Sequence, residues 1–116
     1  MEKIIEEVIR CIDDTQGEDI KLLDISEVSS LTEYFIIATA NSDPHMSALR
    51  DKVLELLEKS NEIVIYYDKG KGYDWLVIDC GYFMVHFFKK EARELYSLET
   101  LWLNGKEVDI SSLNKI

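Results

Sequence analysis

The stretch DWLVIDCGYFMVHFFKKEARELYSLETLW, residues 74–102, decides the fold of this chain. Aromatic and β-branched residues dominate its first half, which is typical of β-strands. Gly81-Tyr82 interrupts the apolar run and fits a tight hairpin turn with glycine in the first central position. We therefore predict an antiparallel hairpin with the cross-strand pairs Cys80–Phe83, Asp79–Met84, Ile78–Val85, Val77–His86 and Trp75–Phe88.

Alternation of side chains gives the predicted hairpin two different faces. One face is uniformly apolar and is expected to be covered by helices; it carries Leu76, Ile78, Cys80, Phe83, Val85 and Phe87. The other face is apolar but includes an acid and an imidazole; it carries Trp75, Val77, Asp79, Met84, His86 and Phe88. A mixed aromatic surface of this kind is typical of the centre of a protein interface. The alternative is that another element of the same chain covers it, with His86 and Asp79 as hydrogen-bonded core residues.

The remainder of the chain predicts the layers around this hairpin. Apolar residues recur at helical spacing over residues 2–14, and acidic residues near the start of that segment favour a helix. The run YFIIATA, residues 34–40, predicts a central strand buried on both faces. Asp43 and Pro44 predict the cap and the first position of the next helix. The other predicted elements are strands at 19–25 and 63–67, a flexible Gly-bearing loop at 68–73 and a helical pattern over 89–103.

These elements give the order α-β-β-α-β-β-β-α in a single α/β (α+β) domain with a mixed sheet of about five strands. We expect two main helices on one face of the sheet and the terminal helix at an edge or on the second face. A chain of 116 residues is long enough for one such core. We assign residues 1–103 to the domain and expect the polar tail, residues 104–116, to be loosely held.

The charge of the chain restricts the class of partner. The net charge is −10, from 23 acidic and 13 basic residues. Such a field repels nucleic-acid phosphates, so direct nucleic-acid binding is not expected, and it favours a basic protein partner. The alternative is that the charge only confers solubility. Because no run reaches the length of a membrane span and no signal or transit pattern begins the chain, we expect a cytoplasmic protein without a membrane partner.

The patterns that catalysis requires do not occur in the sequence. Nucleotidyl transfer, which suits a small mixed sheet, needs metal-binding carboxylates at alternate positions of a strand and a Gly-Ser pair for the triphosphate, and neither occurs. In the predicted register Cys80 and His86 point to opposite faces, which excludes a thiolate–imidazole pair. His45 and His86 lack the spacing of a metal site. We therefore expect no enzyme activity, no metal and no cofactor.

Several blocks of the sequence, in order, resemble the ribosomal silencing factor family, also called the Iojap family. The blocks are Trp75-Leu-Val-Ile-Asp79-x-Gly81, Val85-His86-x-Phe88, Arg93, Tyr96-x-Leu98-Glu99-x-Leu101-Trp102 and, upstream, Thr32-Glu-Tyr-Phe-Ile-Ile-Ala-Thr-Ala-Asn-Ser42 with His45. The likeness covers about residues 2–103. The chain departs from the family at Glu33 and Tyr82, where the family usually has Asp, and at Ala40, where it often has Gly. The departure at Tyr82 removes the acidic group that the family usually has in the hairpin turn.

The resemblance implies a fold related to nucleotidyltransferases but without their activity. It also implies that the chain binds the large ribosomal subunit through ribosomal protein fourteen, blocks association with the small subunit sterically and represses translation when nutrients are short. Homodimers in solution are compatible with the resemblance. The alternatives are a nucleotide-binding or nucleotidyl-transferring enzyme on the same fold, or a dimeric cytosolic interaction module.

The hairpin pattern and the resemblance together predict a set of partner-binding residues: Trp75, Asp79, Tyr82, Met84, His86, Phe88, Glu99 and Trp102. Trp75 is the expected aromatic anchor, and Asp79 and Glu99 are expected to meet basic groups of the partner. Three roles stay open at this point. His86 could contact the partner or form an internal hydrogen bond, Trp102 suits either contact or core, and Arg93 could instead form an internal ion pair.

Overall fold

The computed structural model describes residues 2–96 and 105–111, and within these residues six strands form one mixed sheet in the order β3-β4-β5-β2-β1-β6. The helices are α1 (Lys3–Asp14), α2 (Asp43–Lys59) and α3 (Lys90–Tyr96), and the strands are β1 (Glu18–Asp24), β2 (Tyr34–Ala40), β3 (Tyr66–Tyr67), β4 (Trp75–Asp79), β5 (Phe83–Lys89) and β6 (Lys106–Val108). The predicted order is confirmed from α1 to α3. The structure adds β6 after it.

The hairpin of β4 and β5 has the predicted register. Trp75 lies opposite Phe88 and Val77 opposite His86. The N–H of Cys80 donates to the carbonyl oxygen of Phe83 at 3.0 Å, which closes the turn. Gly81 has φ +87°, a conformation that glycine adopts at little cost, so the glycine fixes the turn and the turn fixes the register.

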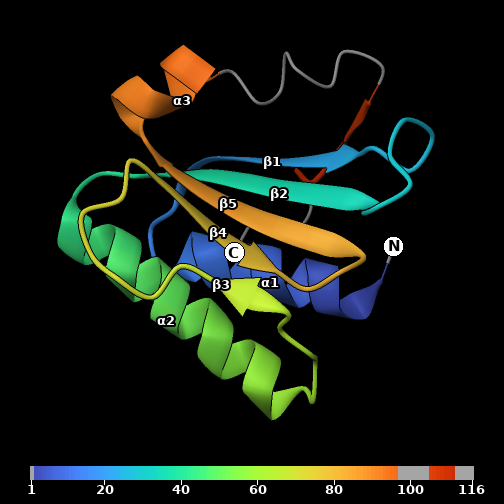
Figure 1. The fold of residues 1–116 in the computed structure, drawn as a ribbon, viewed down its shortest axis with the longest axis horizontal. Coiled ribbons are helices and arrows are strands. Elements are labelled where there is room, and N and C mark those ends of the chain that lie inside the picture. The colour runs from blue at the N-terminus through green and yellow to red at the C-terminus, as the bar shows by residue number, and fades with distance from the viewer. Residues whose placement is uncertain (1, 97–104, 112–116) are drawn as a thin grey trace.

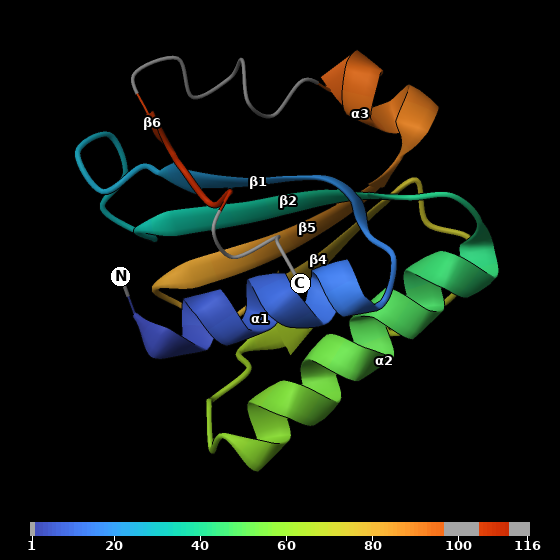
Figure 2. The ribbon, with the colours of Figure 1, turned by 180° about the vertical axis from the view of Figure 1, so that it is seen from behind.

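The sheet separates two layers of unequal thickness. The helices α1 and α2 cover one face, and α3 lies on the opposite side near the end of β5 (Figures 1 and 2). The larger core lies under α1 and α2 and includes the whole apolar face predicted for the hairpin: Leu76, Ile78, Cys80, Phe83, Val85 and Phe87. A smaller cluster on the α3 side contains Leu23, Ile25, Phe35, Ile37, Phe88 and Ala92. The prediction that the terminal helix lies at an edge or on the second face is confirmed.

The central strand is β2, as the continuous apolar run predicts. It pairs parallel with β5 and antiparallel with β1, and its residues 35–40 are all buried. On the α3 side, the buried guanidinium of Arg93 donates to the backbone oxygen of Asp19 at 2.6 Å and to Oγ1 of Thr39 at 2.9 Å. These bonds attach α3 to the sheet beside the hairpin.

Two predicted boundaries are wrong in detail. The cap of α2 is Ser42, not Asp43, because Ser42 has extended backbone angles and its Oγ accepts from the N–H of His45 at 3.1 Å. Asp43 instead forms an ion pair with Nζ of Lys89. The strand predicted at 63–67 is reduced to β3, at the edge of the sheet, because its backbone pairs only with β4.

The described part of the tail differs from the expectation that it is loosely held. Strand β6 pairs antiparallel with β1, with Leu22 opposite Val108. Ile110 is only 7% exposed and packs, with Val108, against the core under α1 and α2. The sequence did not predict β6, because the strand has only three residues and only two apolar side chains attach this polar segment to the core.

Candidate interaction surface

The second face of the hairpin presents one partly exposed group of side chains. Trp75, Val77, Asp79 and Met84 are all partly exposed, and cross-strand pairing places Asp79 beside Met84. Strand β3 extends the group, because Tyr66 pairs with Asp79 and its side chain is 57% exposed. We call these five residues the hairpin face. Its mixture of aromatic, aliphatic and acidic groups is typical of a protein interface.

Trp75 is held from several sides. Its ring stacks on Phe88, with centroids 4.9 Å apart and planes at 29°, and lies 5.0 Å from the ring of Tyr96. Its indole N–H donates to Nδ1 of His86 at 3.0 Å. Trp75 is therefore a partly exposed aromatic residue whose orientation is already fixed by the residues beneath it. Because the side chain is ordered before binding, less conformational entropy is lost when a partner binds.

His86 lies beneath the hairpin face, with 3% of its side chain exposed. Its ring meets Phe35 edge-on at 4.6 Å. Burial lowers the pKa of His86 to about 3, so the ring is neutral at physiological pH. Since Nδ1 accepts from Trp75, the proton is on Nε2, and Nε2 has no hydrogen-bond partner in the described part of the chain. The sequence left open whether His86 contacts a partner or forms an internal hydrogen bond. In the structure it forms an internal hydrogen bond, with Trp75.

Asp79 supports the turn and remains partly exposed. Its Oδ1 accepts from the N–H of Gly81 at 2.9 Å, and its backbone oxygen accepts from the N–H of Ile65 at 2.8 Å. Within residues 2–96 and 105–111, no lysine or arginine forms an ion pair with it. The carboxylate can therefore stabilise the turn and still meet a basic group of a partner.

The remaining predicted site residues are placed differently. Phe88 is fully buried under Trp75, so it supports the hairpin face without contributing surface. Tyr82 packs with the core under α1 and α2, and its hydroxyl donates to Oε1 of Glu62 at 3.4 Å. Burial, together with the nearby carboxylate of Glu62, raises the pKa of Tyr82 to about 12. Tyr82 is thus separate from the hairpin face. Glu99 and Trp102 lie outside the described residues.

Sequence reasoning missed Tyr66. Its hydroxyl donates to Oδ1 of Asp68 at 2.7 Å, and Oδ2 of Asp68 accepts from the N–H of Val77 at 2.9 Å. Alternation in the segment 63–67 shows that Tyr66 and Tyr67 point to opposite faces of the sheet. Only the pairing of that segment with β4 shows that Tyr66 is the one that shares a face with Asp79.

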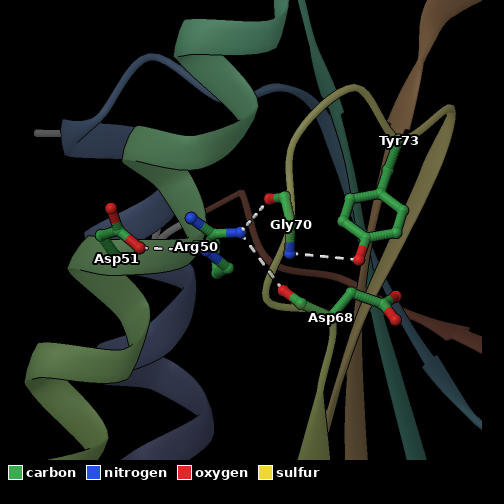
Figure 3. Close-up of polar contacts among 5 residues, drawn as sticks. All are labelled: Arg50, Asp51, Asp68, Gly70 and Tyr73. Atoms are coloured by element: carbon green, nitrogen blue, oxygen red, sulfur yellow. Dashed lines mark hydrogen bonds and ion pairs between the residues drawn. The ribbon is translucent and has the colours of Figure 1, made fainter.

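The loop that leads into β4 is held by a buried arginine of α2. Figure 3 shows the guanidinium of Arg50 between Asp51 on its own helix and the loop. Nη1 donates to the backbone oxygens of Asp68 at 3.2 Å and Gly70 at 2.6 Å, and Nε donates to Asp51 at 3.0 Å. The N–H of Gly70 in turn donates to the hydroxyl of Tyr73 at 3.1 Å. The loop expected to be flexible thus has specific bonds to α2, just before Trp75.

The arrangement does not favour nucleophilic chemistry at the hairpin. Cys80 and His86 lie in clusters on opposite faces of the sheet, as predicted. Burial and the nearby Glu62 raise the pKa of Cys80 to about 12, which keeps the thiol protonated. Among the described residues, no group of three His, Cys, Asp or Glu side chains could hold a metal ion. In the same residues, no helix combines the length and the apolar character that crossing a membrane requires.

Comparison with known proteins shows which family this chain resembles. The family model described as "Ribosomal silencing factor during starvation" matches residues 1–116. The chain is 34% identical to a ribosomal silencing factor of Haemophilus influenzae, over 85% of this chain and 97% of the relative. It is 35% identical to one of Bacillus subtilis, over 84% and 83%. A crystal structure of a Chromobacterium violaceum protein, 28% identical, superposes with a TM-score of 0.83 over 96% of this chain and 93% of that chain.

Proposed function

The chain belongs to the ribosomal silencing factor family, and we propose that it silences ribosomes by occupying a surface of the large subunit that the small subunit needs. The proposed contact on the ribosome is ribosomal protein fourteen, as the resemblance implies. The action is steric, so it requires no turnover by the chain itself. We place this action in the cytoplasm, where the ribosomal subunits meet.

One observation carries the proposal on the side of this chain: a partly exposed tryptophan held in a fixed orientation at the hairpin face. Trp75 rests on Phe88 and Tyr96 and donates to His86. Large aromatic residues held in this way dominate binding energy at interface centres. Two acidic groups accompany the other residues of the hairpin face: Asp79 belongs to the face, and Asp68 accepts from Tyr66 and Val77. They would complement a basic ribosomal protein, and the net charge of −10 favours the approach of such a partner.

Sedimentation of purified ribosomal subunits tests this proposal. The wild-type chain is expected to migrate with the large subunit and to reduce the yield of joined ribosomes. Trp75→Ala is expected to bind at least about 30-fold more weakly, which corresponds to about 2 kcal/mol. The control is Glu58→Ala, because Glu58 is exposed on α2, in the layer on the other side of the sheet from the hairpin face (Figure 1). Unchanged joining at saturating wild-type protein would reject the proposal.

A further inference from the structure

We propose that His86 is a positioning residue, which from beneath the hairpin face sets the orientation in which Trp75 meets a partner. The inference rests on the proposed function, because it concerns the same surface. It assigns to the buried imidazole a role in binding that involves no contact with the partner.

The geometry separates two kinds of restraint on Trp75. Its stacking on Phe88 and its contact with Tyr96 restrict the plane of the indole ring. Stacking is tolerant of sliding and of a flip of the ring within that plane. The hydrogen bond from Nε1 to Nδ1 of His86, at 3.0 Å, is directional and selects one of these placements. The edge of the indole that carries the N–H therefore faces His86, inside the protein, and the opposite edge faces the partner.

The position of His86 is costly for the fold, which argues that the imidazole serves something other than packing. The ring is 3% exposed, and in the described part of the chain its Nε2 lacks a partner. A buried donor without a partner lowers stability, whereas an aliphatic side chain at this position would meet Phe35 without that penalty. Local rules of packing are most often broken at functional sites.

Stability and binding should therefore respond in opposite directions to His86→Leu. The leucine variant is expected to melt at the same temperature as the wild type or higher, because it removes the buried unpaired donor Nε2. The indole N–H that loses its acceptor belongs to a partly exposed residue, so it can bond to water instead. It is also expected to bind purified large subunits about three- to tenfold more weakly, as the loss of one neutral hydrogen bond would produce. Phe87→Leu is the matched control, since Phe87 is the buried neighbour on the other face of β5. That variant should melt lower and, while folded, bind as the wild type does.

Two further variants separate positioning from a general structural effect. In His86→Asn, the amide oxygen takes the place of Nδ1 as acceptor, so binding should return to within about threefold of the wild type even if the variant is less stable. In a Trp75→Phe background the donor is absent, so His86→Leu should weaken binding no further.

The indole N–H of Trp75 gives a readout that a structural role would not change. In ¹H–¹⁵N spectra, the signal lost in Trp75→Phe identifies it. Its hydrogen exchange should be slow in the wild type and in His86→Asn, and fast in His86→Leu.

The outcomes are distinguishable. Failure of the wild-type chain to bind large subunits would overturn the proposed function and this inference with it. Binding by the wild type together with equal binding by His86→Leu, or unchanged exchange of the indole proton in that variant, would overturn the positioning role alone.

Discussion

At the scale of single residues, the burial of His86 makes the stability of the fold depend on pH. Burial lowers the pKa of the ring from 6.5 to about 3, whereas in the unfolded chain it has its ordinary value. Between these values the unfolded chain binds a proton that the folded chain does not, so the free energy of unfolding falls as the pH falls. Above the ordinary pKa neither state is protonated, and this contribution is constant. The slope reaches at most about 1.4 kcal/mol per pH unit.

Urea unfolding between about pH 7 and pH 5, before most carboxylates titrate, measures this slope. The wild type should lose stability toward pH 5, and His86→Leu should lose less over the same range. The difference between the two proteins isolates His86, because the other titrating groups are common to both. Parallel curves for the two proteins would contradict the burial of the ring.

Arg50 is the second residue with a contribution large enough to measure. Its guanidinium satisfies two backbone oxygens of the loop before β4, those of Asp68 and Gly70. Arg50→Met keeps most of the apolar stem but leaves these oxygens without that donor, and we expect it to lower the free energy of unfolding by about 2 kcal/mol. Arg50→Lys should recover only part of this, because an ammonium cannot reproduce the planar fork. Urea denaturation measures both variants.

The exposed Arg10 of α1 provides the control for these measurements. Arg10→Met should change the free energy of unfolding by less than about 0.5 kcal/mol. A loss for Arg50→Met no larger than that for Arg10→Met would show that the loop does not depend on the buried guanidinium.

At the scale of elements, the hairpin turn depends on the backbone freedom of Gly81. With φ at +87° an alanine is strained, and its Cβ would lie 3.2 Å from Cδ1 of Ile65. Gly81→Ala is expected to lower the free energy of unfolding by about 1–2 kcal/mol. Gly81→Asn should cost less, since asparagine tolerates positive φ better than alanine does. Equal losses for the two variants in thermal unfolding would assign the effect to the Ile65 contact rather than to the backbone.

The same turn explains why much of the fold could be predicted. Glycine in the first turn position and strict alternation together leave one register for the hairpin, and the observed pairs agree with it. The coverage of its second face could not be predicted in this way. His86 and Phe88 are buried by residues of other elements, among them Phe35 on β2 and Tyr96 on α3, and such contacts depend on tertiary placement.

The candidate site was predicted to a similar extent. Trp75, Asp79 and Met84 do share one face of the hairpin, because alternation alone determines this. That all three are partly exposed, while His86 and Phe88 on the same face are buried, depends on the tertiary contacts. Tyr82 was assigned to the same surface from its place in the turn, but its ring packs toward the other face, where Phe83 meets it edge-on at 4.9 Å. Tyr66 was missed because a two-residue edge strand has too few residues to reveal its partner.

At the scale of the whole molecule, the net charge of −10 is expected to act on the rate of binding more than on the lifetime of the complex. A basic partner is attracted over distances comparable to the Debye length, about 10 Å at 0.1 M salt. The association rate constant should therefore fall steeply as salt is raised, while the dissociation rate constant changes little. Binding of the chain to surface-immobilised large subunits at a series of salt concentrations measures both constants.

A pair of isosteric variants separates the overall field from the local charge of the hairpin face. Asp79→Asn removes one negative charge but keeps an acceptor for the N–H of Gly81, so the turn should persist. Glu58→Gln removes one negative charge from the exposed surface of α2, in the layer on the other side of the sheet. Steering by the overall field alone would slow association equally in the two variants. Because Asp79 lies on the hairpin face itself, we expect Asp79→Asn to slow association more and also to raise the dissociation rate constant, by about threefold or more. Equal rate constants for both variants would place the partner's contact elsewhere on the molecule.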